Sequence, residues 1–326
     1  MFTPSYINLF HSGELKKRAE RLEARLSACD ICPHNCGVNR LNGEQGICHS
    51  AALPIVASVC AHHGEEPAIS GSRGSGTIFF GNCNLSCIYC QNHQISQVWE
   101  KQRANETDCS TLAKHMLYLQ NELCCHNINL VSPTHFVPLI VRAVLEAASL
   151  GLKIPLVYNT NGYDSALTLK ELDGIIDIYL PDLRYANNKY AEKFSKAEDY
   201  VTHSHAAIKE MYRQTGNLVT DDDGIAERGL VVRHLILPAM LSGSRKSLTW
   251  LAEEISPEVT VSLMAQYSPL FRAGQTTMLN RKITLAEYNY VLALLDELGM
   301  KNGWTQEMES AGKYIPDFER KGHPFP

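Results

Sequence analysis

The sequence has 326 residues, of which 44% are hydrophobic and 20% are charged, a composition that is typical of a globular protein and excludes extended disorder. Thirty Lys and Arg residues against 35 Asp and Glu residues give a formal net charge of −5, which excludes a protein that grips nucleic acid by bulk positive charge. No apolar run approaches the roughly 18 residues that would span a bilayer, and residues 1–6 lack the basic and then apolar order of a secretory signal. We therefore expect a cytoplasmic protein without a membrane or nucleic-acid partner, built as one large domain or two unequal ones.

The first predicted element is a charged amphipathic helix over residues 13–27, with Leu15, Leu22 and Leu26 on one stripe. A stretch rich in Cys, Gly and His follows to about residue 76 and has the pattern of neither a strand nor a helix. From residue 77 onward, short apolar runs alternate with helical segments. Strands are expected at residues 77–80, 128–131, 154–158, 175–180, 230–236 and 259–263. Helices are expected near residues 108–122, 135–150, 165–173, 187–214, 245–255 and 285–298.

Local signals mark several boundaries of these elements. Asp164 and Ser244 are expected to begin helices as N-caps. The turn signal Asp-Asp-Gly at residues 222–224 predicts a small hairpin before the fifth strand. Thr284 and Glu287 form a capping box at the start of the last helix.

Near-continuous apolar strands separated by helices are typical of a parallel sheet that is covered on its outside. Six such units are too few for a closed eightfold barrel, so the sequence predicts an α/β fold with an open, partial barrel. We expect three parts along the chain. They are a helix and a Cys-rich, metal-stabilised segment at 1–76, the barrel at 77–270, and a C-terminal helix with a barrel-capping extension at 271–326.

Eleven cysteines are the unusual feature of the composition. An odd number without a secretory signal indicates metal binding or thiol chemistry. One group contains Cys29, Cys32, Cys36 and Cys48, a second contains Cys83, Cys87 and Cys90, and the scattered ones are Cys60, Cys109, Cys124 and Cys125. Whatever requires thiolates is therefore built from the first third of the chain.

The second group lies in the polar loop of residues 81–93, immediately after the first predicted strand of the β/α series. Loops at the carboxyl ends of parallel strands are where such folds place their sites. Three cysteines spaced C-x3-C-x2-C can reach three irons of a [4Fe–4S] cluster, which leaves one iron open to a ligand that is not protein. Two alternatives stay open: a zinc ion on the three thiolates and His93, and three buried cysteines with a structural role.

The spacing C-x3-C-x2-C, with the aromatic Tyr89 just before the last cysteine, resembles the signature of the radical S-adenosylmethionine (SAM) superfamily. The wider sequence from Gly81 to Asn92 looks most like the relatives of pyruvate formate-lyase activating enzyme. Within that set, the four N-terminal cysteines and the run from Ile128 to His135 resemble a largely uncharacterised branch. The likeness extends from about residue 29 to about residue 270.

The resemblance implies a partial (β/α)6 TIM-like barrel in which Cys83, Cys87 and Cys90 hold a [4Fe–4S] cluster. The amino and carboxylate groups of SAM would chelate the open iron. One electron from the cluster would cleave the sulfonium and give methionine and a 5′-deoxyadenosyl radical, which abstracts a hydrogen atom from the substrate. The chain is therefore expected to be a radical SAM oxidoreductase that needs no catalytic side chain beyond the cluster.

The resemblance also implies a set of SAM-binding residues. Tyr89 would lie beside the adenine. Ser132 and Thr134 stand where the family usually has Gly-Gly-Glu, the motif that binds the methionine amino group. The remaining candidates end later strands and are Asn159, Asn161, Asp182 (followed by Arg184, where relatives have Asp-x-Lys) and Arg233. Alternatively, Asn159 and Asn161 only form a turn with Gly162, and Arg233 pairs with a carboxylate.

The first cysteine group offers four soft ligands in a Gly-rich, irregular segment. Four thiolates around one zinc ion, or around a second Fe–S cluster, both satisfy the count. A structural role is expected for this second metal, because a short segment with a thin core needs a staple. The spare candidate ligands are His34, His49, His62 and His63.

The resemblance also implies a protein or peptide substrate, including a glycyl-radical enzyme that this chain would activate. Reduction of the cluster would require a low-potential donor such as flavodoxin or ferredoxin. Two other classes stay open: a non-catalytic binding module in which both cysteine groups hold zinc, and an Fe–S protein that serves electron transfer or sensing.

Overall fold

The computed structural model describes residues 2–310, 312, 315–320 and 323–325. Within this part of the chain, nine strands form one mixed sheet that is mostly parallel and does not close on itself. The strands are β1 (Val56–His62), β2 (Ser75–Phe80), β3 (Ile128–Val131), β4 (Leu156–Thr160), β5 (Ile178–Pro181), β6 (Val219–Thr220), β7 (Ala226–Leu235), β8 (Thr260–Met264) and β9 (Gly303–Thr305).

The strands follow one another across the sheet in the order β1-β2-β3-β4-β5-β7-β8-β9, with β6 paired to β7. Strand β1 runs antiparallel to β2, and β6 runs antiparallel to β7. The other pairs are parallel. Every residue of β2, β3, β4 and β5 is buried, as expected for parallel strands that are covered on both faces.

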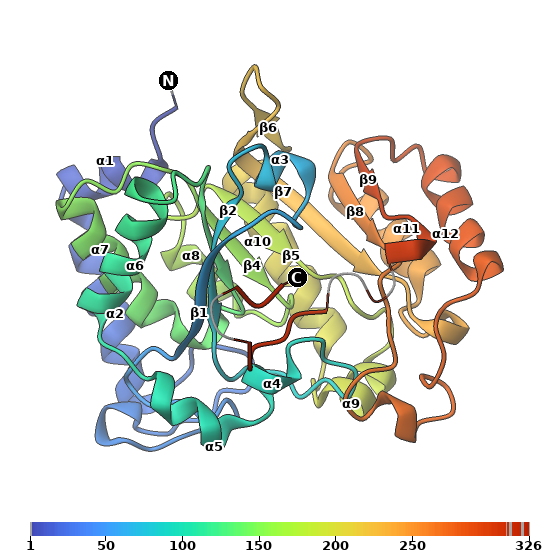
Figure 1. Ribbon diagram of the computed structural model, residues 1–326, viewed down its shortest axis with the longest axis horizontal. Helices are drawn as coiled ribbons and strands as arrows, with labels where there is room; N and C mark the ends of the chain where they lie inside the picture. Colours follow the sequence, from blue (N-terminus) through green and yellow to red (C-terminus); the bar gives the residue numbers. More distant parts are fainter. Residues whose placement is uncertain (1, 311, 313–314, 321–322, 326) are drawn as a thin grey trace.

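Helices cover the sheet and both of its ends. The helices are α1 (Ser5–His11), α2 (Glu14–Ala24), α3 (Pro67–Ser70), α4 (His93–Ser96), α5 (Trp99–Gln102), α6 (Cys109–Asn121), α7 (Val137–Ser149), α8 (Ala166–Glu171), α9 (Asn188–Ser195), α10 (Tyr200–Thr215), α11 (Ser244–Glu254) and α12 (Leu285–Glu297). Figure 1 shows α1, α2, α6 and α7 gathered on one side of the molecule, and α11 and α12 on the opposite side beside β8 and β9. No helix in the described ranges combines the length and the apolar character that crossing a membrane requires.

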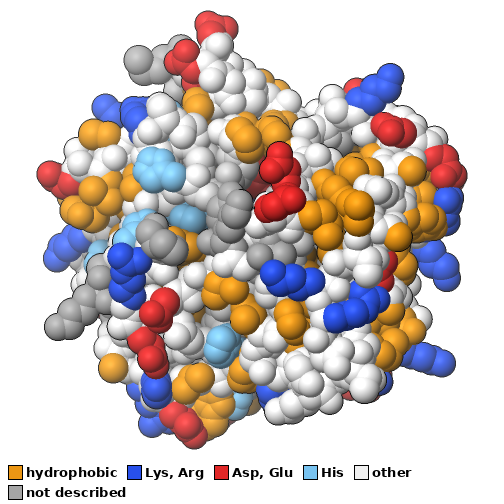
Figure 2. Space-filling view, turned by 45° about the vertical axis from the view of Figure 1, so that its right-hand side comes forward, with side chains coloured by type: hydrophobic (Ala, Val, Ile, Leu, Met, Phe, Trp, Pro, Cys, Tyr) orange, Lys and Arg blue, Asp and Glu red, His pale blue; other side chains and the backbone are white. Residues whose placement is uncertain are grey.

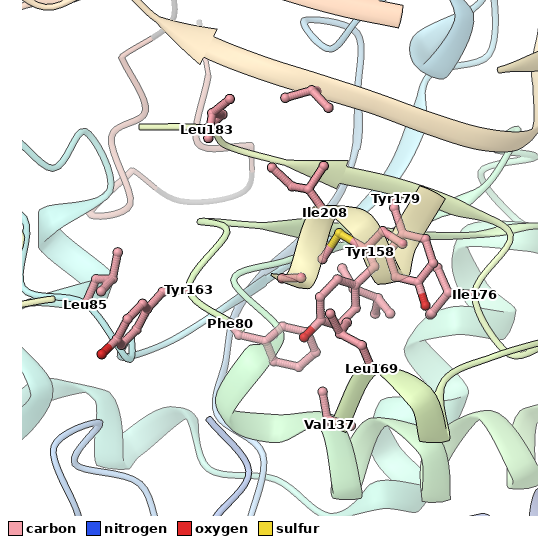
Figure 3. Packing of buried hydrophobic residues seen from close by; sticks show 14 of the residues in the cluster. Phe80, Leu85, Val137, Tyr158, Tyr163, Leu169, Ile176, Tyr179, Leu183 and Ile208 are labelled. Carbon is pink, nitrogen blue, oxygen red and sulfur yellow. The ribbon is translucent and has the colours of Figure 1, made fainter. Parts of the chain in front are cut away.

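The core packs helix side chains against the buried strands. Phe80 of β2, Tyr158 of β4 and Tyr179 of β5 belong to one buried cluster, and the rings of Tyr158 and Tyr179 meet edge to face at 5.8 Å. Val137 of α7 and Leu169 of α8 lie beside these rings (Figure 3). Full burial of one such side chain stabilises the fold by about 1.5–3 kcal/mol, so this cluster holds the strands whose ends carry the site described below.

The α/β class predicted from the sequence is confirmed, and each of the six predicted strands has its counterpart in β2, β3, β4, β5, β7 and β8. The turn at residues 222–224 joins the antiparallel pair β6 and β7. The capping box is present, with Thr284 and Glu287 each accepting from the other's backbone N–H.

The description of residues up to 76 as irregular is wrong in part, because this stretch contains β1 as an antiparallel edge strand. Residues 187–214 form two helices rather than one. The chain turns between them at Lys196 and Asp199, which have φ angles of 52° and 49°.

Two predicted N-caps are also wrong. Helix α8 begins after Ser165, and the carboxylate of Asp164 turns inward, where it accepts hydrogen bonds from Tyr158 and Thr160. Ser244 is the first residue of α11, and its hydroxyl contacts a buried histidine ring instead of the helix backbone.

Candidate functional site

A cavity of about 430 Å³ lies at the carboxyl ends of the parallel strands. Cys90 of the cysteine loop borders it. Six of the seven residues that the resemblance assigned to SAM also line it, and these are Tyr89, Ser132, Asn159, Asn161, Asp182 and Arg233. Polar groups from separate strands therefore converge on one space next to the cysteine loop, the usual location of ligand sites in such sheets.

The cysteine loop is fixed to the strands and to α9 by backbone hydrogen bonds. The N–H of Gly81 donates to the carbonyl of Ile55 at 2.9 Å, at the start of the loop. The N–H groups of Ser86 and Ile88 donate to the last residues of α9 at 3.0 and 2.9 Å. Because α9 was expected as the first part of one long helix, its end-on contact with the loop was not predicted.

Cys87 is the best-supported sulfur of the loop. Ser195 Oγ donates to its Sγ at 3.0 Å, and Arg184 Nη1 lies 3.7 Å from the same atom. Tyr185 and Tyr89 extend this arrangement, since the hydroxyls of Tyr89, Tyr185 and Ser195 form a chain with separations of 2.5 and 2.7 Å. Donors and a nearby guanidinium stabilise an anionic sulfur, so the surroundings of Cys87 suit a thiolate ligand.

The other two sulfurs also face hydrogen-bond donors. Cys83 Sγ accepts from a backbone N–H of its own loop at 3.4 Å and from Asn161 Nδ2 at 3.5 Å. Cys90 Sγ lies 3.2 Å from Ser96 Oγ. Burial raises the pKa of Cys83 to about 12 and that of Cys90 to about 11, so a bound cation is needed before these thiols lose their protons near neutral pH.

Each of the three thiols on this loop lies near a hydrogen-bond donor. This arrangement is suited to thiolate ligands of an Fe–S cluster. In the described part of the chain, no three His, Cys, Asp or Glu side chains are already arranged as around an ion, so the thiols would converge on binding. His93, the alternative fourth ligand for zinc, places its Nδ1 3.2 Å from the carbonyl oxygen of Cys90, and its ring stacks on Phe271.

Thr134 lies apart from the other residues assigned to SAM, because its hydroxyl belongs to a buried network below the cavity. Thr134 Oγ1 donates to Asp164 Oδ1 at 2.8 Å, and the same carboxylate accepts from Tyr158 and Thr160. Burial raises the pKa of the Asp164 carboxyl, and the hydrogen bonds from these three hydroxyls oppose that rise only in part. Ser132 instead borders the cavity in a left-handed conformation with a φ angle of 58°.

Asn161 forms the predicted turn and also lines the cavity. Its Oδ1 accepts from the N–H of Tyr163, as in an Asx turn. Its Nδ2 donates to Asn84 Oδ1 at 2.8 Å and approaches Cys83 Sγ. The turn after β4 thus holds the cysteine loop in place while it borders the cavity.

Arg233 pairs with carboxylates, as the second of its two sequence-based interpretations stated, and it also lines the cavity. Its Nε and Nη2 donate to the two oxygens of Glu66 at 2.7 and 2.6 Å, and Nη2 also contacts Glu65. Its Nη1 donates to Asn159 Oδ1 at 3.2 Å. The acidic pair was not predicted as part of the site, since it lies in the stretch expected to be irregular.

The ionised groups of the cavity do not balance. Glu65, Glu66 and Asp182 contribute three carboxylates, and Arg184 and Arg233 contribute two guanidinium groups. One negative charge is therefore in excess inside the cavity, which favours a ligand with a positive charge. On the face shown in Figure 2, by contrast, acidic and basic side chains are interspersed.

The four N-terminal cysteines border a second, much smaller cavity of about 10 Å³, together with Arg40 and His135. All eleven cysteines are free thiols in this structure. Two of the spare histidines have other contacts: His34 Nε2 lies 2.7 Å from the carbonyl oxygen of Asn84, and the His49 ring stacks on Trp99 at 4.4 Å. Arg40 was not singled out by the sequence.

No known protein-family model matches the chain. A curated protein of Methanocaldococcus jannaschii, named Uncharacterized protein MJ0674, is 27% identical over 281 residues. The similarity covers 83% of this chain and 75% of the archaeal protein. A similar chain therefore exists in an archaeon, and its name assigns no activity.

Proposed function

We propose that this protein is a radical SAM enzyme in which Cys83, Cys87 and Cys90 hold a [4Fe–4S] cluster and SAM occupies the neighbouring cavity. The observation that carries the proposal is the convergence of the three-cysteine loop with six of the seven candidate SAM residues at one edge of the sheet. When bound, the cluster and SAM would supply one-electron cleavage of the sulfonium and abstraction of a hydrogen atom from the substrate. The open sheet would then be a partial (β/α)6 barrel made of β2 to β5, β7 and β8.

The chain's own residues would bind and orient the cofactor pair and exclude water. SAM is a cation at its sulfonium and carries an ammonium group, which agrees with the excess carboxylate of the cavity. Ser132, Asn159 and Asn161 offer hydroxyl and amide groups at the ends of β3 and β4 for its polar atoms. Glu65 and Glu66 would take the electrostatic role of the acidic residue that Ser132 and Thr134 replace.

The substrate class rests on the resemblance to activating enzymes. We propose a protein or peptide substrate, with activation of a glycyl-radical enzyme as its most specific form and flavodoxin or ferredoxin as the electron donor. The enzyme would act in the cytoplasm.

The test is anaerobic reconstitution with iron and sulfide, followed by addition of dithionite and SAM. We expect the brown protein to release 5′-deoxyadenosine and methionine, which liquid chromatography measures. Cys87→Ala should abolish the release, because it removes the sulfur that Ser195 and Arg184 support. The matched control is Cys124→Ala, an exposed thiol outside the cavity, which should behave like the wild type.

Two results would contradict the proposal. A colourless protein that takes up no iron would favour the zinc-binding module. A brown protein whose reduced EPR spectrum does not respond to SAM would favour electron transfer or sensing.

A further inference from the structure

We infer that Cys29, Cys32, Cys36 and Cys48 bind one zinc ion as a tetrathiolate, with the buried guanidinium of Arg40 as its counter-charge, and that this centre holds the loop that carries Cys83. The inference concerns zinc alone and is independent of the radical SAM proposal. It rests on the charge of Arg40, the size of the cavity and the contacts between the two cysteine groups.

Short backbone contacts bring the four cysteines to the border of one small cavity, although in the described residues no three of their thiols are yet arranged as around an ion. The N–H of Cys29 donates to the carbonyl of Val38, and the N–H of Gly37 donates back to the carbonyl of Cys29, at 3.0 and 2.9 Å. This closes a loop that contains Cys32 and Cys36. A Cβ at Gly46 would lie 2.7 Å from Cys36 Sγ, so only glycine lets the chain before Cys48 approach this closely.

Arg40 supplies the charge argument. It is 1% exposed. Among the described residues, its hydrogen-bond partners are the carbonyl oxygens of Ala51 and His135 and the sulfur of Cys29 at 3.9 Å, and none of them is a carboxylate. A buried guanidinium without an anion is strongly unfavourable. The four thiols are the group within reach that can supply an anion, once they lose their protons to a metal.

The charges then agree. Zinc bound to four thiolates has two negative charges in excess, and Arg40 offsets part of them. The proton count follows directly, since each of the four thiols releases one proton to solvent when zinc binds.

The size of the cavity favours zinc over a second Fe–S cluster. A volume of about 10 Å³ between the cysteines is close to the space of one water-sized atom, whereas a cubane has eight atoms. The ligand spacings of two and three residues are those of structural zinc sites.

Two contacts connect this site to the radical SAM motif. His34, between Cys32 and Cys36, contacts the carbonyl oxygen of Asn84 at 2.7 Å. The carbonyl oxygen of His49, the residue after Cys48, accepts from Asn82 Nδ2 at 2.9 Å. One neighbour of Cys83 is thus held by the residue after Cys48 and the other by a residue between Cys32 and Cys36, so zinc binding should order the loop around Cys83.

Zinc content of the full chain is the first measurement. We expect one zinc ion per chain by plasma mass spectrometry, with no loss in Cys87→Ala or in the control Cys124→Ser. Cys36→Ser and Cys48→Ser should each lose most of it. Three results would each overturn the inference. The chain could fail to take up zinc from zinc chloride, or both serine variants could retain it. A chain that lacks Cys83, Cys87 and Cys90 could also bind iron and sulfide at these four cysteines.

Variants of Arg40 test the counter-charge. Competition with a chromogenic chelator should show zinc binding about 10–100-fold weaker in Arg40→Met, with Arg40→Lys between it and the wild type. The zinc-induced rise in melting temperature should also be smaller in Arg40→Met, because its metal-free form no longer buries a lone cation. An affinity of Arg40→Met within twofold of the wild type would refute the role of Arg40. Should Arg40→Met fail to fold, Arg40→Lys decides in the same assay.

Alkylation of Cys83 in iron-free protein tests the connection without any cluster. Zinc should slow labelling of Cys83 by iodoacetamide several-fold relative to Cys109, as measured by peptide mass spectrometry. His34→Ala should retain zinc and lose this protection. Equal labelling of Cys83 with and without zinc would refute the connection between the two sites.

Discussion

Arg233→Met tests the charge arrangement of the large cavity through stability alone. In the wild type, the guanidinium donates to Glu66 through two nitrogens and also contacts Glu65, and the two glutamate side chains are 5% and 8% exposed. Methionine keeps the length and volume of the stem but leaves two carboxylates side by side in a buried position. Removal of one partner from such a group costs about 3–5 kcal/mol, and we expect this loss of unfolding free energy at pH 7.

The pH dependence of that loss has a definite sign. Burial alone would raise the pKa of Glu66, but attraction and hydrogen bonds from Arg233 leave it below its ordinary value. Its stabilising contribution in the wild type is therefore present above the unfolded pKa of about 4.3 and is lost as the pH falls through the lower folded value. In Arg233→Met, burial and the neighbouring Glu65 raise the pKa of Glu66. Its contribution to stability is then present below the unfolded pKa of about 4.3 and is lost as the pH rises through the higher folded pKa.

Urea unfolding at pH 5 and pH 7, followed by tryptophan fluorescence, measures this difference. The difference in unfolding free energy between the wild type and Arg233→Met should increase from pH 5 to pH 7. The increase should be about 1.4 kcal/mol for each unit by which the folded pKa of the glutamate pair is raised within that range. The matched control is Arg245→Met, which breaks an exposed ion pair with Glu297 and should cost at most about 1 kcal/mol at either pH. A gap for Arg233→Met that is equal at the two pH values, or larger at pH 5, would refute the assigned charge arrangement.

Two further predictions concern the cysteine loop and the edge of the sheet. Ser195→Ala removes the hydroxyl that donates to Cys87 Sγ and should lower the affinity for reconstituted iron by roughly tenfold. The control Ser149→Ala, at an exposed position, should leave this affinity unchanged. Equal iron retention by the two variants in a chelator challenge would contradict the role of the Ser195 hydroxyl. Gly303→Ala would place a Cβ 1.9 Å from a carbonyl oxygen of β8, at a φ of 132°, and should lower the unfolding free energy by more than about 2 kcal/mol. Gly274→Ala, which meets nothing within 4 Å, is its control, and similar urea midpoints for the two variants would show that β9 does not require glycine.

Local sequence patterns were sufficient for the six strands β2 to β5, β7 and β8 and for the position of the cysteine loop. Strands β2 and β3 are short apolar runs that are buried on both faces, and such runs are visible without tertiary information. The capping box at Thr284 depends on a residue only three positions away. Cys83 follows β2 directly, so its place at the edge of the sheet follows from the chain order.

Contacts between distant residues could not be predicted in the same way. Arg233 and Glu66 are 167 positions apart, and no periodicity connects them. The resemblance placed Thr134 among the candidate SAM-binding residues, but its hydroxyl donates to the inward-turned carboxylate of Asp164. An Asp before a helix is an ordinary N-cap signal; here burial among hydroxyl donors outweighs that local preference.

The two guanidinium groups beside the cysteines differ in a way that agrees with two kinds of centre. Arg184 lies near Cys87 and has its own carboxylate partner, Asp182, so it adds no net charge to a site that would gain an electron and bind a cationic ligand. Arg40 lies near Cys29 without a carboxylate partner among the described residues, so it adds a full positive charge. A zinc tetrathiolate would be an anion next to Arg40, whereas the second cysteine group faces an arginine that Asp182 already pairs. This difference in charge agrees with our proposals of a zinc ion at the first cysteine group and a redox-active cluster at the second.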